Sequence, residues 1–293
     1  MHMRFVLALC LWGTGLAAET TGPKEGTLVV VGGGRMGHEI VREFIDAAGG
    51  IDQPFVILPT ALEGEDWGDS YRHRSFLMRA GARDVTVLHT RDPQIANTDE
   101  FQAPLIRARG VWIDGGRQWR LADAYQGTKT EQALHAVLAR GGVIGGSSAG
   151  ATIQGSYLVR GAPEGNQIMM APGHEVGFGF VRNCAVDQHV IARLRQDDLA
   201  PVIAAHPELL GLGIDEGTAI IVRGGHLRVV GTSAVLIHHR SLSPQPDGKS
   251  YEMLWAGGEY DLPARRIVKA VPPSPPSARR LHRAAVTPEP SRP

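Results

Sequence analysis

Short apolar runs alternate with helical patterns along the first half of the chain, and this alternation restricts the fold more than any other feature. The apolar, largely β-branched runs lie at residues 27–31, 55–58, 84–88, 110–113 and 142–145. Helical patterns separate most of them, at residues 36–48, 69–80, 98–108 and 128–140. This alternation predicts an α/β fold with a mostly parallel sheet sandwiched between helices, because each crossover lays a helix on a face of the sheet.

The pattern changes after about residue 210. Two apolar runs, at residues 219–223 and 227–230, flank the pair Gly224-Gly225. A glycine pair between two such runs is typical of an antiparallel hairpin. Residues 235–238 form a further apolar run. We therefore expect a C-terminal antiparallel β extension of the sheet.

The two ends of the chain differ in composition from the part between them. Residues 1–18 have a basic start, a short apolar run and small residues at the end, which is typical of a secretory signal peptide. The apolar run is too short to span a bilayer. Residues 271–293 hold 7 of the 19 prolines, which predicts disorder. We expect one domain over residues 19–270 and a secreted or periplasmic location.

Charge and cysteine content argue against several classes of protein. The chain has 30 basic and 30 acidic side chains, so its net charge gives no basis for binding nucleic acid or an anionic membrane. The only cysteines are Cys10 and Cys184, too few for a disulfide framework or a zinc–thiolate cluster. The 12 histidines include no His-Glu-x-x-His spacing. We expect neither a metal nor a cofactor.

Two glycine motifs directly follow predicted strands. Gly32, Gly34 and Gly37 match G-x-G-x-x-G, but the next strand ends in Pro59-Thr60 and lacks the acidic residue that would hold a ribose. We therefore predict a tight strand-to-helix turn there and no NAD site.

The second motif, residues 146–150, reads Gly-Ser-Ser-Ala-Gly and matches G-x-S-x-G between a strand and a helix. That context is typical of a nucleophile elbow, in which small neighbours leave room for a strained serine. A plain small-residue turn that packs a helix against the sheet would have the same letters. We expect Ser148, ahead of Ser147, to be a nucleophile.

A nucleophilic serine needs a base and a group that orients the base. His189 ends the triplet Asp187-Gln188-His189, and if a helix begins there it shares a face with Arg193. On a solvated face, Arg193 would instead pair with Asp197. An acid follows the apolar run 212–214 at Asp215-Glu216, where an ordinary acidic turn is the alternative. Spacing alone leaves both assignments open.

Four motifs taken in order resemble the cyanophycinase family, which belongs with peptidase E in peptidase family S51 and shares the fold of class I glutamine amidotransferases. They are Gly-Gly-Arg-Gln at 115–118, Gly-Gly-Ser-Ser-Ala-Gly-Ala at 145–151, Asp-Gln-His at 187–189 and Gly-Ile-Asp-Glu-Gly-Thr-Ala at 213–219. The likeness covers roughly residues 27–238. The order Ser…His…Glu also differs from the Ser…Asp…His order of α/β-hydrolases, which argues against an esterase.

The resemblance implies a role for each matching residue. Ser148 is the implied nucleophile, His189 the general base and acid, and Glu216 the carboxylate that orients it. The implied oxyanion-hole donors are the backbone groups of Gly116 and Ala149. The positions that would line the substrate pocket are Gln118, Asp187, Gln188, Arg193 and Arg195.

The resemblance also implies hydrolysis of β-aspartyl (isopeptide) linkages, such as those of cyanophycin, without a cofactor and in a possible homodimer. Arginine suits the free α-carboxylate of such a peptide, and Asp187 could meet the guanidinium of an arginine-bearing substrate. Asp198 stands where the family has a third arginine, and Arg117 is an unexpected charge beside the oxyanion loop. An Asp-Xaa dipeptidase of the peptidase E type, an esterase and a non-catalytic peptide-binding protein remain the alternatives.

Overall fold

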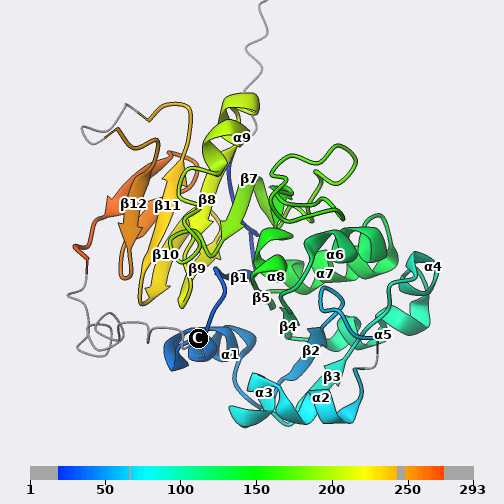
Figure 1. Ribbon diagram of the computed structural model, residues 1–293. Helices are drawn as coiled ribbons and strands as arrows, with labels where there is room; N and C mark the ends of the chain where they lie inside the picture. The colour runs from blue at the N-terminus through cyan, green and yellow to red at the C-terminus, as the bar shows by residue number, and fades with distance from the viewer. Residues whose placement is uncertain (1–18, 66, 243–247, 274–293) are drawn as a thin grey trace, which may run out of the picture.

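The computed structural model describes residues 19–65, 67–242 and 248–273. The predicted signal peptide and all but the first three residues of the proline-rich segment lie outside these ranges. The described chain forms two β-sheets and a set of short helices (Figure 1). No helix in the described ranges combines the length and the apolar character that crossing a membrane requires.

The larger sheet has nine strands in the order β14-β13-β10-β9-β1-β5-β4-β2-β3. All neighbours among its last five strands are parallel. These five strands are the five apolar runs predicted from the sequence: β1 (Thr27–Val31), β5 (Val143–Ser147), β4 (Gly110–Ile113), β2 (Pro54–Leu58) and β3 (Asp84–Val87). The predicted α/β class with a mostly parallel sheet is confirmed for this half of the sheet.

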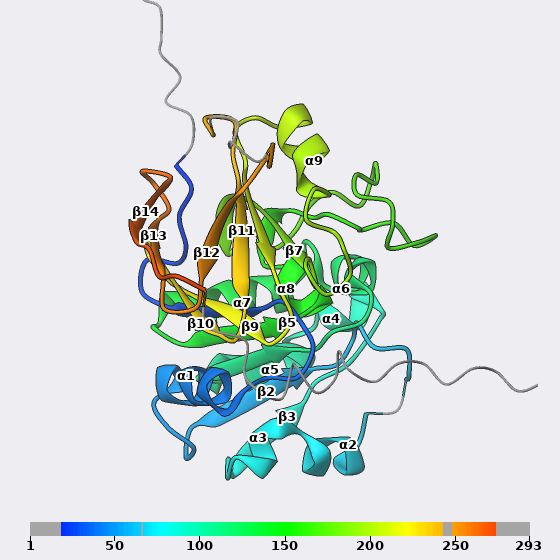
Figure 2. The same ribbon diagram turned by 60° about the vertical axis from the view of Figure 1, so that its left-hand side comes forward.

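The antiparallel part of the same sheet is the predicted C-terminal extension, except that residues 235–238 belong to the second sheet. Strand β9 (Thr218–Arg223) pairs with β1 and forms a hairpin with β10 (His226–Gly231), as Gly224-Gly225 predicts. Strands β13 (Glu259–Asp261) and β14 (Arg266–Lys269) complete the edge. Figure 2 shows these two strands at the outer edge, beside the first described residues, where Arg265 hydrogen-bonds Thr20.

The second sheet has five strands that the sequence did not group together. Its order is β12-β11-β8-β7-β6. The strands β6, β7 and β8 are parallel, whereas β11 and β12 are antiparallel additions. Their bounds are β6 (Gly155–Tyr157), β7 (Val181–Gln188), β8 (Leu210–Ile214), β11 (Ala234–His238) and β12 (Glu252–Trp255). The helix start considered at residue 187 is therefore wrong, because these residues end strand β7.

Helices cover both faces of the parallel sheet. They are α1 (His38–Ala48), α2 (Asp69–Arg74), α3 (Phe76–Arg79), α4 (Pro93–Ala96), α5 (Asp99–Arg107), α6 (Gln118–Tyr125), α7 (Lys129–Ala139), α8 (Ala149–Thr152) and α9 (Leu199–Ala205). Alternate residues of β1 face opposite sides: Val29 belongs to the hydrophobic cluster that includes residues of α1 and α3, and Leu28 belongs to the one that includes residues of α5, α6 and α7. Both faces of β1 are buried, which explains its uninterrupted apolar sequence.

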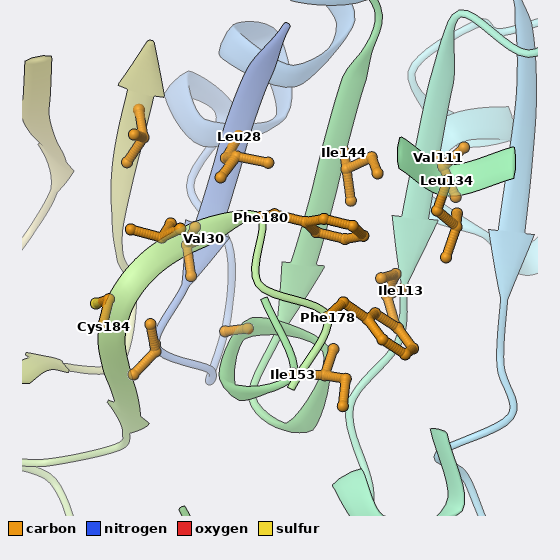
Figure 3. Packing of buried hydrophobic residues seen from close by; sticks show 14 of the residues in the cluster. Leu28, Val30, Val111, Ile113, Leu134, Ile144, Ile153, Phe178, Phe180 and Cys184 are labelled. Carbon is orange, nitrogen blue, oxygen red and sulfur yellow. The ribbon is translucent and has the colours of Figure 1, made fainter. Parts of the chain in front are cut away.

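The segment before β7 contributes to the core on the second face. Figure 3 shows Phe178 and Phe180 packed beside Ile144 and Ile153, with Cys184 further along the same segment. Cys184 is fully buried, and burial raises the pKa of its thiol. This packing joins the second sheet to the first.

The first face has an aromatic centre at Phe44 of α1. Its ring lies 5.3 Å from the ring of Trp112 and 5.9 Å from that of Phe55, centroid to centroid.

We expect Phe44→Ala to lower the free energy of unfolding by about 3–5 kcal/mol, because deletion of a buried ring leaves a cavity. Chemical denaturation measures the change. Arg42→Ala on the exposed side of α1 is the matched control, with an expected change below about 0.5 kcal/mol. Equal effects of the two substitutions would contradict this account of the core.

Candidate active site

Three predicted residues from distant parts of the chain form one hydrogen-bonded series. The Nε2 atom of His189 lies 2.9 Å from the Oγ atom of Ser148, and its Nδ1 atom lies 2.6 Å from Oε1 of Glu216. A carboxylate can only accept, so Nδ1 carries the proton and Nε2 is free to accept from the serine hydroxyl. This arrangement of nucleophile, base and orienting acid is the one that acyl transfer requires.

Ser148 lies in the sharp turn between β5 and α8. Its φ of 56° and ψ of −114° are strained for a residue with a side chain. Its backbone N–H donates to the carbonyl oxygen of Val31, which attaches the turn to β1. A Cβ atom at Gly146 would lie 2.2 Å from the carbonyl oxygen of Gly150, and one at Gly150 would lie 2.0 Å from that of Ile113. The small residues of the motif are therefore a steric requirement of the elbow.

His189 follows β7 directly and is 5% exposed. Burial lowers the pKa of its imidazole, and the guanidinium groups of Arg193 and Arg195 lower it further, although the hydrogen bond to Glu216 acts in the opposite direction. The net shift keeps the ring neutral near neutral pH. A neutral imidazole is the form that can accept a serine proton.

Asp215, the residue before Glu216, anchors the turn that follows His189. Its Oδ1 atom accepts hydrogen bonds from the backbone N–H groups of Ile191 and Ala192, at 3.1 and 2.9 Å. Its Oδ2 atom accepts from Ser233 at 2.7 Å. The two adjacent acids thus have separate tasks: Glu216 contacts the imidazole, and Asp215 holds the backbone that carries it.

The first glycine motif makes room for the imidazole and for Glu216. A Cβ atom at Gly33 would lie 2.1 Å from Cε1 of His189, and one at Gly34 would lie 2.8 Å from Oε2 of Glu216. Gly32 accepts a hydrogen bond of 2.8 Å from the backbone N–H of His189. The predicted strand-to-helix turn is present at residues 32–37, and its glycines are needed because the site packs directly on their backbone.

The Gly115-Gly116 loop after β4 lies against the serine. A Cβ atom at Gly115 would lie 3.2 Å from Cβ of Ser148. Gly116 has a φ of 135°, and a Cβ atom there would lie 2.1 Å from the carbonyl oxygen of Ala61. Ala149 is the first residue of α8, where a helix leaves its N–H groups without intrahelical partners. The two predicted oxyanion-hole positions, Gly116 and Ala149, therefore lie on the two segments that adjoin Ser148.

Asp187 does not present a free carboxylate. It is fully buried, and Nε and Nη2 of Arg160 donate to its two oxygens at 2.7 and 2.9 Å. The same Nη2 atom also donates to Asp198 at 2.6 Å. We expected Asp187 to bind a guanidinium of the substrate. In the structure, the guanidinium of Arg160 already binds both of its carboxylate oxygens.

The other residues predicted to line the substrate pocket differ in their burial and in their hydrogen-bond partners. Gln188 is buried, with its Oε1 atom 3.5 Å from Ser148 Oγ. Gln118 is also buried and donates to the carbonyl oxygen of Val159 at 2.9 Å. Arg193 is exposed, whereas Arg195 is 7% exposed. The unexpected Arg117 donates to the carbonyl oxygen of Ala162 at 2.7 Å, so it supports a neighbouring loop.

Comparison with known proteins places the chain in a family. The sequence profile of Peptidase family S51 matches residues 28–230. The cyanophycinase of Synechococcus elongatus is 33% identical over 223 residues, which cover 73% of this chain and 68% of that protein. The cyanophycinase of Trichormus variabilis is 31% identical, with 76% of each chain covered. The chain belongs to peptidase family S51.

Solved structures have the same fold. A peptidase from an acI-B1 Actinobacterium superposes with a TM-score of 0.63 at 25% identity, covering 82% of this chain and 98% of its own. A peptidase E candidate from Listeria monocytogenes EGD-e gives a TM-score of 0.52 at 16% identity, covering 71% and 99%. Membership in family S51 supports a peptidase of the cyanophycinase or peptidase E type.

Two features of this S51 site were missed by sequence reasoning. Arg160 lies between the second and the third of the four motifs, outside both, and the residues around it match no motif that would mark it as part of a site. Asp114 immediately precedes the Gly115-Gly116 loop and accepts hydrogen bonds from Tyr71 of α2 and, at 3.1 Å, from Nε1 of Trp112. An acid directly before a double glycine at a strand end is a sequence signal that points to Asp114.

Within the described part of the chain, no cluster of three or more His, Cys, Asp or Glu side chains is placed to hold a metal ion.

Asp114 makes the stability of the fold depend on pH. Burial raises its pKa to about 6 from an ordinary value of 3.8, although the hydrogen bonds from Tyr71 and Trp112 oppose the shift. The folded state therefore retains a proton that the unfolded state releases between about pH 4 and pH 6. The contribution of Asp114 to the free energy of unfolding must decrease as the pH rises through this window, by about 3 kcal/mol.

Denaturant titration of the wild type and Asp114→Asn across this window tests the shift. We expect the stability of the wild type relative to the variant to decrease from pH 4 to pH 7, because only the wild type can ionise at this position. The other titratable groups are common to both proteins and cancel in the difference. A difference that stays constant with pH would contradict the raised pKa.

Proposed function

We propose that the chain is a serine-type peptidase that hydrolyses bonds at β-aspartyl residues. The observation that carries the proposal is the hydrogen-bonded series from Ser148 through His189 to Glu216, with distances of 2.9 and 2.6 Å. Membership in family S51 supports peptide hydrolysis over ester hydrolysis or simple peptide binding. The cyanophycinase names of the relatives support a substrate that contains β-linked aspartate.

In the proposed reaction, Ser148 Oγ attacks the carbonyl carbon while its proton moves to Nε2 of His189. Glu216 stabilises the imidazolium through the Nδ1 hydrogen bond. The backbone N–H groups of Gly116 and Ala149 face the developing oxyanion. The C–N bond then breaks, and His189 returns the proton to the leaving amine. Water then attacks the acyl carbon while His189 takes its proton, and His189 passes this proton to Ser148 Oγ as the acyl–oxygen bond breaks, which restores the serine.

Arg193 and Arg195 provide the charge for recognition of the substrate. Both guanidinium groups lie near enough to His189 to affect its pKa. A guanidinium binds a carboxylate through paired hydrogen bonds. We assign these two arginines to the free α-carboxylate of a β-aspartyl peptide. An α-linked Asp-Xaa dipeptide would offer its side-chain carboxylate instead, so the peptidase E type of activity is the second candidate.

We further propose that the protein acts outside the cytoplasm. The basis is the signal-peptide pattern of residues 1–18. Fractionation of producing cells tests the location, and the mass of the exported protein tests the cleavage site. We expect an N-terminus near residue 19. A cytoplasmic protein with its original N-terminus would refute this proposal without affecting the peptidase proposal.

Replacement of Ser148 tests the peptidase proposal. Purified protein is incubated with cyanophycin and with a β-Asp-Xaa dipeptide, and the products are separated by chromatography. We expect turnover by the wild type and a loss of more than about 10³-fold in Ser148→Ala, because the nucleophile is absent. Release of β-Asp-Arg from cyanophycin would indicate cleavage of its backbone, and release of free arginine would indicate cleavage of the isopeptide bond.

Ser147→Ala is the matched control, since it removes the neighbouring hydroxyl from the same turn. We expect it to retain activity, and we expect both variants to unfold at the temperature of the wild type. Full activity in Ser148→Ala would refute the assignment of the nucleophile.

The pH dependence of kcat/KM tests the role of His189. The base must be neutral, and burial together with the two arginines lowers its pKa from 6.5. We therefore expect activity to be lost as the pH falls, with the midpoint of the acidic limb below 6.5. A rate that stays constant down to pH 4 would argue against a histidine base.

A further inference from the structure

Arg160 is a charged residue in the interior of the protein beside the candidate active site. It lies after β6 and is fully buried. Its guanidinium binds both oxygens of Asp187 and one oxygen of Asp198, and its Nη1 atom donates to the carbonyl oxygen of Asn166 at 2.8 Å. Paired, bidentate contacts of this kind are the strongest that a guanidinium makes.

Of the two aspartates, Asp187 is unavailable to a ligand and Asp198 is partly engaged. Asp187 is fully buried, and its Oδ1 atom accepts a second hydrogen bond of 2.9 Å from the backbone N–H of Gln188. Asp198 is held inward by Arg160, with 37% of its side chain exposed. A second guanidinium that approached Asp187 or Asp198 would find Arg160 already bound to each carboxylate.

Arg195, in contrast to Arg160, is not fully paired within the described residues. Arg195 is 7% exposed, and its Nη1 atom has no hydrogen-bond partner among residues 19–65, 67–242 and 248–273. Arg160, Arg193, Asp187 and Asp198 all act electrostatically on it, so these groups form one cluster. A buried donor without a partner is costly unless a ligand supplies an acceptor. The open position of the cluster therefore suits an anion and repels a cation.

Backbone strain marks the same region. Six described residues other than glycine have a positive φ, and they include Ser148, Arg160 and His189. Strained conformations persist where the surrounding contacts hold a functional geometry. Arg160 shares this property with the proposed nucleophile and base, which argues against an incidental structural arginine.

We propose that Arg160 is a specificity-determining residue that occupies the position of a substrate guanidinium. The site then selects β-aspartyl peptides whose second residue is neutral or acidic and discriminates against those with a cationic side chain. This inference rests on the proposed peptidase function and narrows its substrate class. Small acidic β-aspartyl peptides, and not the arginine-bearing polymer, become the preferred substrates.

Binding to the Ser148→Ala protein tests the proposal without turnover. Calorimetry at neutral pH compares β-Asp-Arg with β-Asp-citrulline, in which a neutral urea group of nearly the same shape replaces the guanidinium, and with β-Asp-Glu. We expect the citrulline and glutamate peptides to bind at least about tenfold more tightly, because like charges in a desolvated site repel. Binding of β-Asp-Arg equal to or tighter than that of its citrulline counterpart would overturn the proposal.

A pair of variants tests the residue itself. Arg160→Met in the Ser148→Ala background releases Asp187, so β-Asp-Arg should gain affinity relative to β-Asp-citrulline. Adding Asp187→Asn should remove most of this gain, because the carboxylate is then absent. An unchanged ratio in a folded Arg160→Met protein would refute the role of Arg160. If that variant does not fold, as thermal unfolding would reveal, the binding ratio with Arg160 intact decides the question.

Hydrolysis of the same peptides by the wild-type protein separates this inference from the proposed function. If none of the peptides and no cyanophycin is hydrolysed, the peptidase proposal fails, whereas the binding ratio still tests the charge preference. If all are hydrolysed and β-Asp-Arg is the best substrate by kcat/KM, the peptidase proposal stands and the role of Arg160 is refuted.

Discussion

The candidate site depends on the contact between the ends of two sheets. The hydrogen bond from the backbone N–H of His189 to the carbonyl oxygen of Gly32 joins the end of β7 to the end of β1. Ser148 is attached to β1 as well, through its own backbone N–H and Val31. The serine and the histidine are therefore both positioned by the same buried strand. Contacts with this strand therefore hold the two side chains 2.9 Å apart.

Close packing of backbone against side chains gives the site its shape. The imidazole of His189 lies on Gly33, and Glu216 lies on Gly34, at distances that leave no space for a side chain. The elbow glycines at residues 146 and 150 have the same steric origin. Burial of the imidazole lowers its pKa, and the surrounding guanidinium groups act in the same direction. The packing that holds the imidazole in place thus also favours its neutral form.

Much of the fold and part of the site could be predicted from local pattern. All five parallel strands and the β9–β10 hairpin were predicted, because apolar β-branched runs and a glycine pair determine conformation over a few residues. The second sheet was not predicted as a separate sheet, although residues 235–238 of β11 were expected as a strand, since β6, β7 and β8 pair across long separations in sequence. Residue 187 was considered as a helix start, although its partner strand makes it the end of β7. Pairing between distant segments leaves no periodic signal in either segment alone.

The amino-acid sequence by itself determined the α/β class, the elbow around Ser148 and, through four ordered motifs, the resemblance to family S51. These are matters of local geometry and of residue identity at short spacing. Only the tertiary structure decided how the charged side chains around Asp187 are paired. It brings Arg160 to Asp187 across 27 residues and to Asp198 across 38, and it leaves Nη1 of Arg195 without a protein partner in the described chain. Whether a buried carboxylate meets a substrate or an internal arginine depends on which side chain fills the space beside it, and that is settled only when the chain is folded.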